Sequence, residues 1–326
     1  MKSEILSLLR ESGDYVSGQE LCEHFGVTRA AVWKAINQLK KEGYDIDAVQ
    51  NRGYRLVSER ELYGKNELES RIRTRWAGRN VVFYEITDST NVQAKRLAEQ
   101  GAVEGTLVVA EEQTAGRGRR GRDWRSPAGS NIYFTLLLRP EYATDCASMV
   151  TLVMAFAVRE AVQEICGMDA GIKWPNDVVM GGKKVTGILT EMSLEGMEIQ
   201  HVVIGVGINV KEQTFPAEIA DRATSLEEAA GKPVSRAALL QKIMEHFEAD
   251  YEKFLQTKDL SLLKQEYNEV LVNLGREVRV LDPAGEYSGT ALGINEKGEL
   301  LVRTADGSVK EVYAGEVSVR GIYGYV

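Results

Sequence analysis

The apolar positions of the first sixty residues recur at helical spacing in short runs and then alternate. Apolar residues three or four apart predict a helix at the start of the chain and two more after it. Ser17-x-x-Glu20 is a capping box that opens the second helix, and Thr28 is the expected N-cap of the third. Two alternating runs, 46–49 and 54–57, flank Asn51-Arg52-Gly53 and predict a hairpin. Three helices followed by a hairpin are typical of a winged helix-turn-helix domain.

From about residue 65 to 270, strand-like and helix-like segments alternate. The strand-like runs are 81–86, 106–110, 131–138, 178–180, 184–190 and 201–209, and the helix-like runs are 91–100 and 147–166. Hairpin turns between neighbouring strands, such as Gly181-Gly182, favour antiparallel pairing. We therefore expect a largely antiparallel or mixed sheet with its helices on one side.

The chain from residue 275 onward carries only short alternating runs. They are 277–281, 287–294, 299–304, 310–313 and 317–320, with turn sequences at 282–285, 295–298 and 305–308. Regular short strands of this kind predict a small β-barrel. The fold class is therefore multidomain α+β, with expected domains at residues 1–62, 65–272 and 275–326.

Composition narrows the class of protein. The chain has 326 residues, of which 44% are hydrophobic and 27% charged, as in soluble globular proteins of two or three domains. The three cysteines are far apart and form no Cys-x-x-Cys pair, which argues against a disulfide framework or a structural zinc site. The longest apolar run, residues 149–158, is too short to span a bilayer, and no signal peptide is expected. We expect a cytoplasmic protein without a membrane segment.

The strongest chemical signal is Gly116-Arg-Gly-Arg-Arg-Gly-Arg122, which places four arginines and three glycines in seven residues of a chain with net charge −8. Guanidinium groups match carboxylate and phosphate oxygens, and glycine lets backbone close around such a ligand. The spacing also fits the dinucleotide fingerprint, but Pro127 and Gly129 disfavour the helix that this fingerprint requires afterwards. A solvated basic loop that touches nucleic acid is the second alternative. We expect a loop that wraps a small anion or a polyphosphate.

Three further polar clusters lie in the middle segment. They are Asp88-Ser-Thr-Asn91, Lys173-Trp-Pro-Asn-Asp177 and Gly205-Val-Gly-Ile-Asn209. Each has a structural explanation as well as a functional one. The first can be an ordinary helix N-cap, the second a rigid turn, and the third a strand whose glycines permit tight packing. Taken one at a time, these clusters do not decide between the explanations.

The first sixty residues carry nine Lys/Arg and nine Asp/Glu, so this segment is neutral while the rest of the chain holds the negative charge. The third predicted helix is locally basic, and its outward face suits phosphate and base contacts. The candidate DNA-binding residues are Thr28, Arg29, Ala30, Lys34, Asn37, Arg52 and Arg55. A winged helix used only for protein contacts is the alternative. Because one neutral copy would bind DNA weakly, we expect a dimer.

Together these strings, with Lys184-Val-Thr-Gly-Ile-Leu189, resemble one family in order and spacing. That family is the bifunctional biotin–protein ligases that also repress the biotin operon, and the resemblance covers the whole chain. It implies a central domain with the fold shared by class II aminoacyl-tRNA synthetases, and a C-terminal SH3-like barrel.

The resemblance also implies roles for individual residues. Biotin would be bound by Ser89, Thr90, Asn91, Gln113, Gly116, Arg117, Gly118, Arg119 and Lys184, and ATP by Arg119, Arg122, Lys173, Asn176 and Asn209. Catalysis would rest on Arg119, Arg122 and Lys184. Mg²⁺ would accompany ATP, with no protein ligand assigned. Some members place a tryptophan against the adenine in the loop at 211–226, where this chain has only Phe215.

The implied reaction forms biotinyl-5′-adenylate and then transfers biotin to a lysine of a biotin carboxyl carrier protein domain, of acetyl-CoA carboxylase or a related carboxylase. The implied regulation is operator binding by a homodimer that carries the adenylate. Three alternatives remain open at this point: a biotin-sensing repressor without ligase activity, a ligase that has lost operator binding, and a lipoate or octanoyl ligase.

Overall fold

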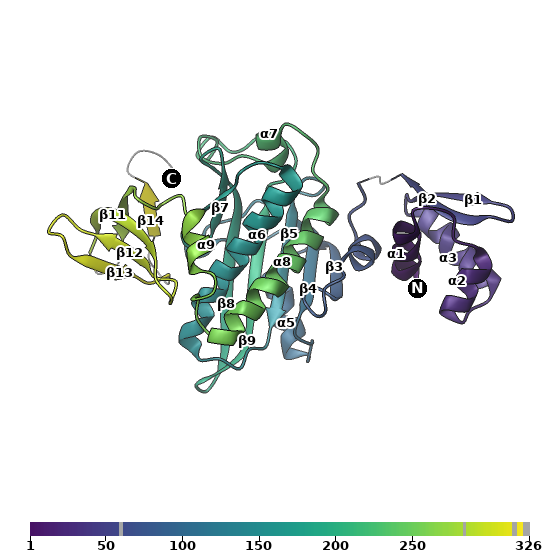
Figure 1. Cartoon of the computed structure of the whole chain (residues 1–326), viewed down its shortest axis with the longest axis horizontal. Coiled ribbons are helices and arrows are strands. Elements are labelled where there is room, and N and C mark those ends of the chain that lie inside the picture. The colour runs from purple at the N-terminus through teal and green to yellow at the C-terminus, as the bar shows by residue number, and fades with distance from the viewer. Residues whose placement is uncertain (59–60, 283–284, 315–317, 322–326) are drawn as a thin grey trace. The chain divides into compact units, whose positions relative to one another are not determined.

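The computed structural model describes residues 1–58, 61–282, 285–314 and 318–321 (Figure 1). The chain forms two compact units. The first comprises Met1–Arg73 with Ser235–Gln241, and the second comprises Thr74–Val234 with Lys242–Val326. The expected domain boundary at residues 273–275 falls inside the second unit.

The first unit begins with the expected winged helix-turn-helix. Its elements are α1 (Lys2–Ser12), α2 (Gly18–Phe25), α3 (Arg29–Lys41), β1 (Asp45–Val49) and β2 (Gly53–Ser58). The predicted caps are confirmed, because Ser17 accepts a hydrogen bond from the Glu20 amide at 3.0 Å and Thr28 accepts one from the Ala31 amide at 3.3 Å. Leu6, Leu21 and other apolar side chains of the helices form a buried core.

A short helix that the sequence analysis did not name, α4 (Lys65–Arg71), belongs to the same unit. It packs against α1, where the Arg10 guanidinium lies 3.0 Å from a carboxylate oxygen of the nearly buried Glu67. Ser7 also donates a hydrogen bond to the Ser70 carbonyl. These contacts group residues 65–71 with the winged helix, although the sequence-based boundary assigns them to the central domain.

The second unit is built on a seven-stranded mixed sheet with the order β3-β4-β5-β9-β8-β7-β6. The strands are β3 (Asn80–Thr87), β4 (Thr106–Gln113), β5 (Ile132–Leu138), β6 (Gly171–Lys173), β7 (Asp177–Met180), β8 (Lys183–Glu195) and β9 (Glu198–Ile208). Only the β3–β4 pair is parallel. The expectation of a largely antiparallel or mixed sheet is confirmed.

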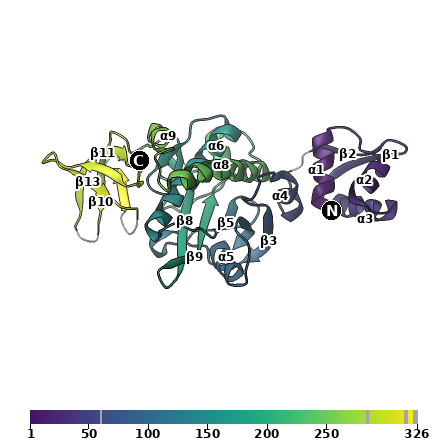
Figure 2. The ribbon, with the colours of Figure 1, turned by 60° about the horizontal axis from the view of Figure 1, so that its bottom comes forward.

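Helices cover both faces of this sheet, so the expectation that they share one side was wrong. α6 (Met149–Cys166) and α8 (Arg236–Thr257) lie over one face, and α5 (Thr90–Glu99) lies over the other (Figure 2). The strand alternation agrees with this arrangement, because Thr190 of β8 contacts Thr151 of α6 whereas Gly205 of β9 faces Asn91 of α5. The ligand-binding predictions concentrate on the α5 face.

Several elements lie outside the sequence-based predictions: β6, the helices α7 (Leu226–Ala230), α8 and α9 (Lys264–Glu269), and two short 3₁₀ segments, η1 (Arg119–Gly121) and η2 (Thr144–Ser148). The 22-residue α8 is the largest omission. Its buried residues include Leu240, Phe247 and Phe254. By contrast, the predicted buried helix within 147–166 is confirmed as α6.

The C-terminal segment forms a five-stranded antiparallel sheet in the order β13-β12-β11-β10-β14. Its strands are β10 (Glu277–Leu281), β11 (Tyr287–Ile294), β12 (Leu300–Arg303), β13 (Val309–Val312) and β14 (Ser318–Gly321). All five strands were expected within one or two residues, although residue 317 and part of the turn at 282–285 lie outside the described residues. Within the described part, the pairings run from β13 to β14 without joining these two end strands, and barrel closure stays a prediction. No helix among the described residues is both long and apolar enough to cross a bilayer.

A pair of carboxyl groups lies between α6 and α8, away from the predicted ligand residues. Glu160 Oε2 and Asp250 Oδ2 are both buried without another hydrogen-bond partner. Burial, followed by the neighbouring Asp250, raises the pKa of Glu160 to about 8. Lys253 contacts the other side of Asp250 at 3.0 Å, and His246 lies 3.5 Å from Glu160. Glu160 is therefore protonated at neutral pH, and its hydrogen bond with Asp250 favours this form.

This pair predicts a pH dependence of stability. Because the folded pKa of Glu160 lies above the ordinary glutamate value, its protonated form favours the folded state, and this contribution is lost as pH rises from about 4.5 through about 8. We expect Glu160→Gln to flatten the pH dependence of the urea-unfolding midpoint over this window. Glu198→Gln, which changes an exposed carboxylate, is the matched control. An unchanged slope in Glu160→Gln would contradict the raised pKa of Glu160.

Candidate functional site

The first predicted cluster lies where β3 leads into α5. Ser89 occupies the N-cap position, yet its side chain makes no capping hydrogen bond. Gln113, the last residue of β4, accepts hydrogen bonds at its Oε1 from the Thr90 amide at 2.8 Å and from the Thr90 hydroxyl at 3.2 Å. Its amide nitrogen donates to the Ser126 hydroxyl at 2.9 Å. An ordinary cap therefore does not explain this cluster, since the buried Ser89 hydroxyl is not used for capping.

Asn91 extends this cluster across the sheet. It donates hydrogen bonds to the Leu189 carbonyl and to the Glu191 carboxylate, and it accepts one from the buried Thr135 hydroxyl at 2.6 Å. A Cβ at Gly205 would lie only 2.0 Å from Asn91 Oδ1. The first glycine of the Gly-Val-Gly-Ile-Asn strand is thus required by the approach of Asn91.

Glu191 keeps a negative charge at this place. Burial tends to raise the pKa of its carboxyl group, but hydrogen bonds from Lys95 and Asn91 outweigh burial, and the pKa lies below its usual value. The Lys95 ammonium is 2.6 Å from the carboxylate. Glu191 therefore fixes the orientation of Asn91 as an acceptor toward Thr135.

Two further glycines, Gly187 and Gly207, lie under Trp124, which directly follows the arginine loop. We call the part of β8 and β9 that carries Gly187, Gly205 and Gly207 the glycine floor. Gly187 and Gly207 are cross-strand partners in β8 and β9. A Cβ at Gly207 would lie 2.4 Å from the indole, and one at Gly187 would lie 2.9 Å from it. The indole nitrogen is buried without a hydrogen-bond partner. The bare backbone of the two strands thus provides a surface on which a flat ring system rests.

Cations outnumber anions beside this floor. Lys184 Nζ is 2.6 Å from an oxygen of Asp177 and 5.4 Å from the centroid of the Trp124 ring. Lys173 is 6% exposed, and burial lowers its pKa to about 8, with Asp177 opposing this effect and Lys184, Arg320 and Arg222 adding to it. One buried carboxylate therefore neutralises part of a larger positive charge, which favours binding of an anion.

The arginine loop is a compact turn. The Gly118 amide donates to the Arg122 carbonyl at 2.7 Å, and the Trp124 amide donates to the Gly116 carbonyl at 3.0 Å. A Cβ at Gly116 would lie 2.5 Å from the Trp124 carbonyl. Three of the four arginines are exposed: Arg117, Arg120 and Arg122. Arg119 alone turns inward.

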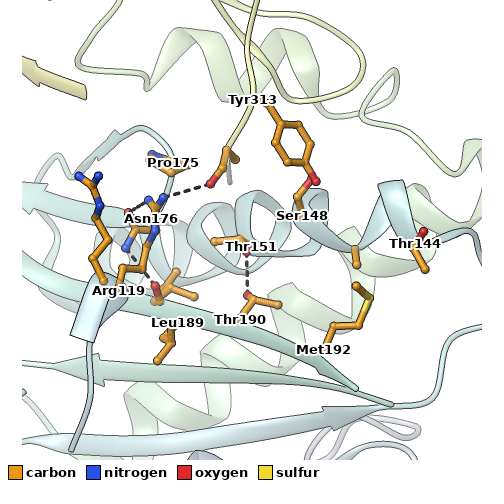
Figure 3. A pocket seen from close by; sticks show the side chains of 14 residues that line it. Arg119, Thr144, Ser148, Thr151, Pro175, Asn176, Leu189, Thr190, Met192 and Tyr313 are labelled. Atoms are coloured by element: carbon orange, nitrogen blue, oxygen red, sulfur yellow. Dashed lines mark hydrogen bonds between the residues drawn. The ribbon is translucent and has the colours of Figure 1, made fainter. Parts of the chain in front are cut away.

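Arg119 links the loop to two other parts of the unit. Its guanidinium donates to Asn176 Oδ1 at 3.0 Å and to the Ala314 carbonyl, near the end of the C-terminal sheet, at 3.1 Å. It borders a cavity of about 590 Å³ (Figure 3). Hydroxyl groups from α6, η2, β8 and the C-terminal segment also line this cavity, namely those of Thr144, Ser148, Thr151, Thr190 and Tyr313. Of the residues predicted for ATP, only Arg119 and Asn176 line it.

The other two motifs have clear structural roles. Trp174 is buried and its indole donates to the Gly298 carbonyl at 3.0 Å, so the Lys-Trp-Pro-Asn-Asp turn is anchored in the interior rather than at the surface. Asn209 donates to the Thr224 carbonyl at 3.3 Å, and its carbonyl accepts from the Leu226 amide. Asn209 therefore holds the end of the 211–226 loop. Phe215, the aromatic residue noted there, is half-buried.

In the first unit, the predicted DNA-binding residues fall into two groups. Arg29, Ala30 and Lys34 are exposed on α3, Asn37 is half-buried, and Thr28 caps the helix. The two arginines of the hairpin, Arg52 and Arg55, lie 4.2 and 4.7 Å from the centre of one ring, that of Tyr15. The structure thus brings the hairpin arginines together at Tyr15, between α1 and α2.

Sequence reasoning missed several residues of the site. They are Trp124, Thr135, Asp177, Gly187 and Glu191, which pack against or hydrogen-bond the predicted residues. Some signals were present. Thr135 is a lone polar residue in an apolar strand, and Asp177 closes a motif that was already singled out. Glu191 carried no such signal, because its role depends on how α5 packs against β8.

Comparison with known proteins agrees with this geometry. Models of three families match: the biotin/lipoate A/B protein ligase family over residues 83–209, an HTH domain over 2–55, and the biotin protein ligase C-terminal domain over 274–320. The chain is 37% identical to the bifunctional ligase/repressor BirA of Bacillus subtilis, over 98% of both chains. The chain belongs to the bifunctional biotin–protein ligase/repressor family.

A further relative and a solved structure agree with this assignment. The Escherichia coli bifunctional ligase/repressor BirA is 30% identical over 97% of this chain and 96% of its own. Among solved structures, the biotin protein ligase of Aquifex aeolicus in complex with biotin and ATP superposes with a TM-score of 0.66, at 37% identity over 74% of this chain and 99% of that one. The Aquifex aeolicus ligase and the matched C-terminal family model are named for biotin, which disfavours the lipoate or octanoyl alternative.

The close contact between Gly205 and Asn91 predicts that adding one methyl group at Gly205 lowers the stability of the protein. Gly205→Ala would place a Cβ 2.0 Å from Asn91 Oδ1 and must displace Asn91 from Thr135 and Glu191. We expect a loss of about 1–3 kcal/mol in the free energy of unfolding, because buried polar groups lose their partners. Gly64→Ala, where nothing lies within 4 Å of the new Cβ, is the control for chemical denaturation of both variants. Equal stability of the two would contradict this role of Gly205.

Proposed function

We propose that the protein is an ATP-dependent biotin–protein ligase that forms biotinyl-5′-AMP and transfers biotin to a lysine of a biotin carboxyl carrier protein, and that it also represses genes of biotin synthesis or transport. The observation that best supports ligase activity is the pair of strands that forms the glycine floor, together with the charged groups beside it. These groups are the cations Lys184, Lys173 and Arg119 and the buried carboxylate of Asp177. A ring system can lie on the floor while anionic groups reach the cations. The family and its biotin- and ATP-bound neighbour support this function.

The first chemical step joins two anions. An oxygen of the biotin carboxylate attacks the α-phosphorus of ATP, the bond to the β-phosphate oxygen breaks, and pyrophosphate leaves. In the second step the neutral amine of the carrier lysine attacks the carboxyl carbon, AMP leaves, and the amine loses a proton. Preorganised cations lower the repulsion in the first step, and positioning supplies much of the remaining acceleration.

Individual roles are proposed from the resemblance to biotin–protein ligases. Ser89, Thr90, Asn91 and Gln113 would bind the polar end of biotin at the start of α5, with Arg117 and the backbone of Gly116 and Gly118 closing over it. Lys184 would meet the carboxylate, and Arg119 would bridge carboxylate and phosphate. The residues assigned to ATP are Arg119, Arg122, Lys173, Asn176 and Asn209. Catalysis would rest on Arg119, Lys184 and Arg122, and Trp124 would exchange its contact with the floor for one with the ligand.

Mg²⁺ is proposed to reach the site with ATP. In the described part of the chain, no group of three or more His, Cys, Asp or Glu side chains is placed to hold a metal ion. Mg²⁺ commonly keeps several waters and binds through substrate phosphates with one or two carboxylates. When bound it would neutralise phosphate charge, and we assign no protein ligand to it.

The repressor function rests on the winged helix in the same chain. A neutral domain with a basic α3 and two hairpin arginines would bind DNA weakly as one copy, so we propose a homodimer that forms when the adenylate is bound. The predicted contacts are Thr28, Arg29, Ala30, Lys34, Asn37, Arg52 and Arg55. Such a protein would act in the cytoplasm, on the operator and on the carrier domain of a carboxylase. The SH3-like closure of the C-terminal sheet belongs to the same proposal.

The direct test is mass spectrometry of a carrier domain after incubation with biotin, Mg²⁺ and ATP, together with gel shifts of the upstream region of biotin genes. The proposal expects a biotin-sized mass increase on the carrier and DNA binding that strengthens with biotin and ATP. An unmodified carrier with ligand-dependent DNA binding would identify a repressor without ligase activity. A modified carrier with DNA binding indifferent to the ligands would identify a ligase without operator control.

Arg119→Ala should slow adenylate formation by ~10²–10³, the usual cost of removing one donor aimed at developing charge. It also removes the contacts with Asn176 and the Ala314 carbonyl, so the intermediate should dissociate faster. Pyrophosphate release and retention of labelled adenylate measure the two effects. Arg125→Ala, which removes an exposed arginine that does not line the cavity, should behave like wild type and is the control. Equal behaviour of both variants would remove Arg119 from the mechanism.

Lys173 predicts a pH dependence of the first step. Because burial lowers its pKa to about 8, the charged form needed for a phosphate contact is lost as pH rises through that value. We expect kcat/KM for ATP to fall above about pH 8. In Lys173→Arg this falling limb should move to higher pH, because guanidinium stays protonated. Lys232→Arg, at an exposed position, should leave the pH profile unchanged. If the fall of kcat/KM occurs at the same pH in Lys173→Arg as in wild type, Lys173 does not make the proposed phosphate contact.

A further inference from the structure

One large aromatic side chain of the first unit is left in solvent. Trp33 is 63% exposed, although α3 buries four other residues against the core, namely Val32, Ala35, Ile36 and Leu39. Leaving an indole in water forgoes much of the free energy that its burial would supply. The core of the unit does not use Trp33, so its role lies in contact with something outside the unit.

The neighbours of Trp33 indicate what that partner is. Residues three and four positions apart share a face of a helix, so Trp33 lies beside Arg29, Ala30 and Asn37, with Lys34 next to it in the chain. The first turn of α3 carries no acidic residue, and the last turn carries two lysines. The Arg29 guanidinium is held toward α2 by a hydrogen bond to Gln19 at 3.0 Å. An aromatic ring among cations on the second helix of a helix-turn-helix suits a polyanion that also offers apolar groups.

Double-stranded DNA has this chemistry. The major groove displays thymine methyl groups, and the backbone displays apolar deoxyribose between phosphates. We propose that Trp33 is a DNA-contacting residue, whose indole packs on thymine methyl groups or deoxyribose of the operator between the phosphate contacts of Arg29 and Lys34. This inference rests on the proposed repressor function and adds a residue to the set predicted for it. A protein partner fits less well, because the cores of such interfaces are depleted in charge and Trp33 is surrounded by it.

The test uses the full-length protein with biotin, Mg²⁺ and ATP. Wild type, Trp33→Ala, Trp33→Phe and Val57→Ala each select duplexes from a random library, and their affinities for the wild-type consensus duplex are then measured. Val57 is 50% exposed on β2 and controls for loss of an exposed apolar side chain away from α3. Thermal unfolding of each variant shows that the unit remains folded.

We expect Trp33→Ala to bind the consensus duplex roughly 5- to 150-fold more weakly, the range of a lost base-pair contact. Trp33→Phe should lose less because it keeps an apolar ring, and Val57→Ala should bind like wild type. Replacing thymidine by deoxyuridine, which lacks the methyl group, distinguishes a contact with a thymine methyl group from a contact with deoxyribose. If Trp33 contacts a methyl group, one such replacement weakens wild type but not Trp33→Ala. If it contacts deoxyribose, Trp33→Ala weakens binding to all selected sequences equally.

Two results would overturn the inference, and they differ. In the first, wild type selects a consensus sequence, and Trp33→Ala is folded and binds that sequence as tightly as wild type does. This result would show that Trp33 does not contact DNA, and it would leave the repressor function intact. Selection of no sequence by wild type removes the operator function itself, and the Trp33 assignment with it. Ligase activity on the carrier domain should be the same in all four proteins in either case.

Discussion

The candidate site depends on backbone left bare at three positions of a paired sheet. Gly205 admits Asn91, and Gly187 and Gly207 together admit the Trp124 indole. Any side chain at these positions would occupy the space of a group that another element brings in. The hydrogen bonds of Asn91 with Thr135, Leu189 and Glu191 then tie the start of α5 to the strands. The site is therefore made by the close approach of helix, loop and sheet, and glycine is the residue that permits it.

Charge is the second constraint on this arrangement. Lys173 and Lys184 lie near the carboxylate of Asp177, and the charge of Asp177 also acts on Arg119, which approaches from the loop. Burial lowers the pKa values of Lys173 and Arg119, because a charged group loses hydration there. Anionic ligands restore this balance. A protein that joins a carboxylate to a nucleotide needs such a deficit of negative charge before its substrates arrive.

The first unit follows a different physical logic. Its core is complete without Trp33, and its charge sums to nearly zero over the first sixty residues. The winged helix-turn-helix therefore leaves an aromatic side chain exposed without a net charge of its own, and it shares one chain with the biotin/lipoate ligase domain.

The sequence by itself determined the local elements and the chemistry of the motifs. Capping residues Ser17 and Thr28, the hairpin around Asn51 and the strands at 277–281 and 287–294 follow from short-range rules, and the structure has them there. These rules did not predict the 22-residue helix α8. They also did not predict that helices cover both faces of the sheet, because this depends on how segments far apart in the sequence pack. Tertiary structure alone decided that Gly205 faces Asn91, that Glu191 orients it, and that Trp124 lies on β8 and β9, because strand register sets which residues meet across a sheet and no local pattern encodes it.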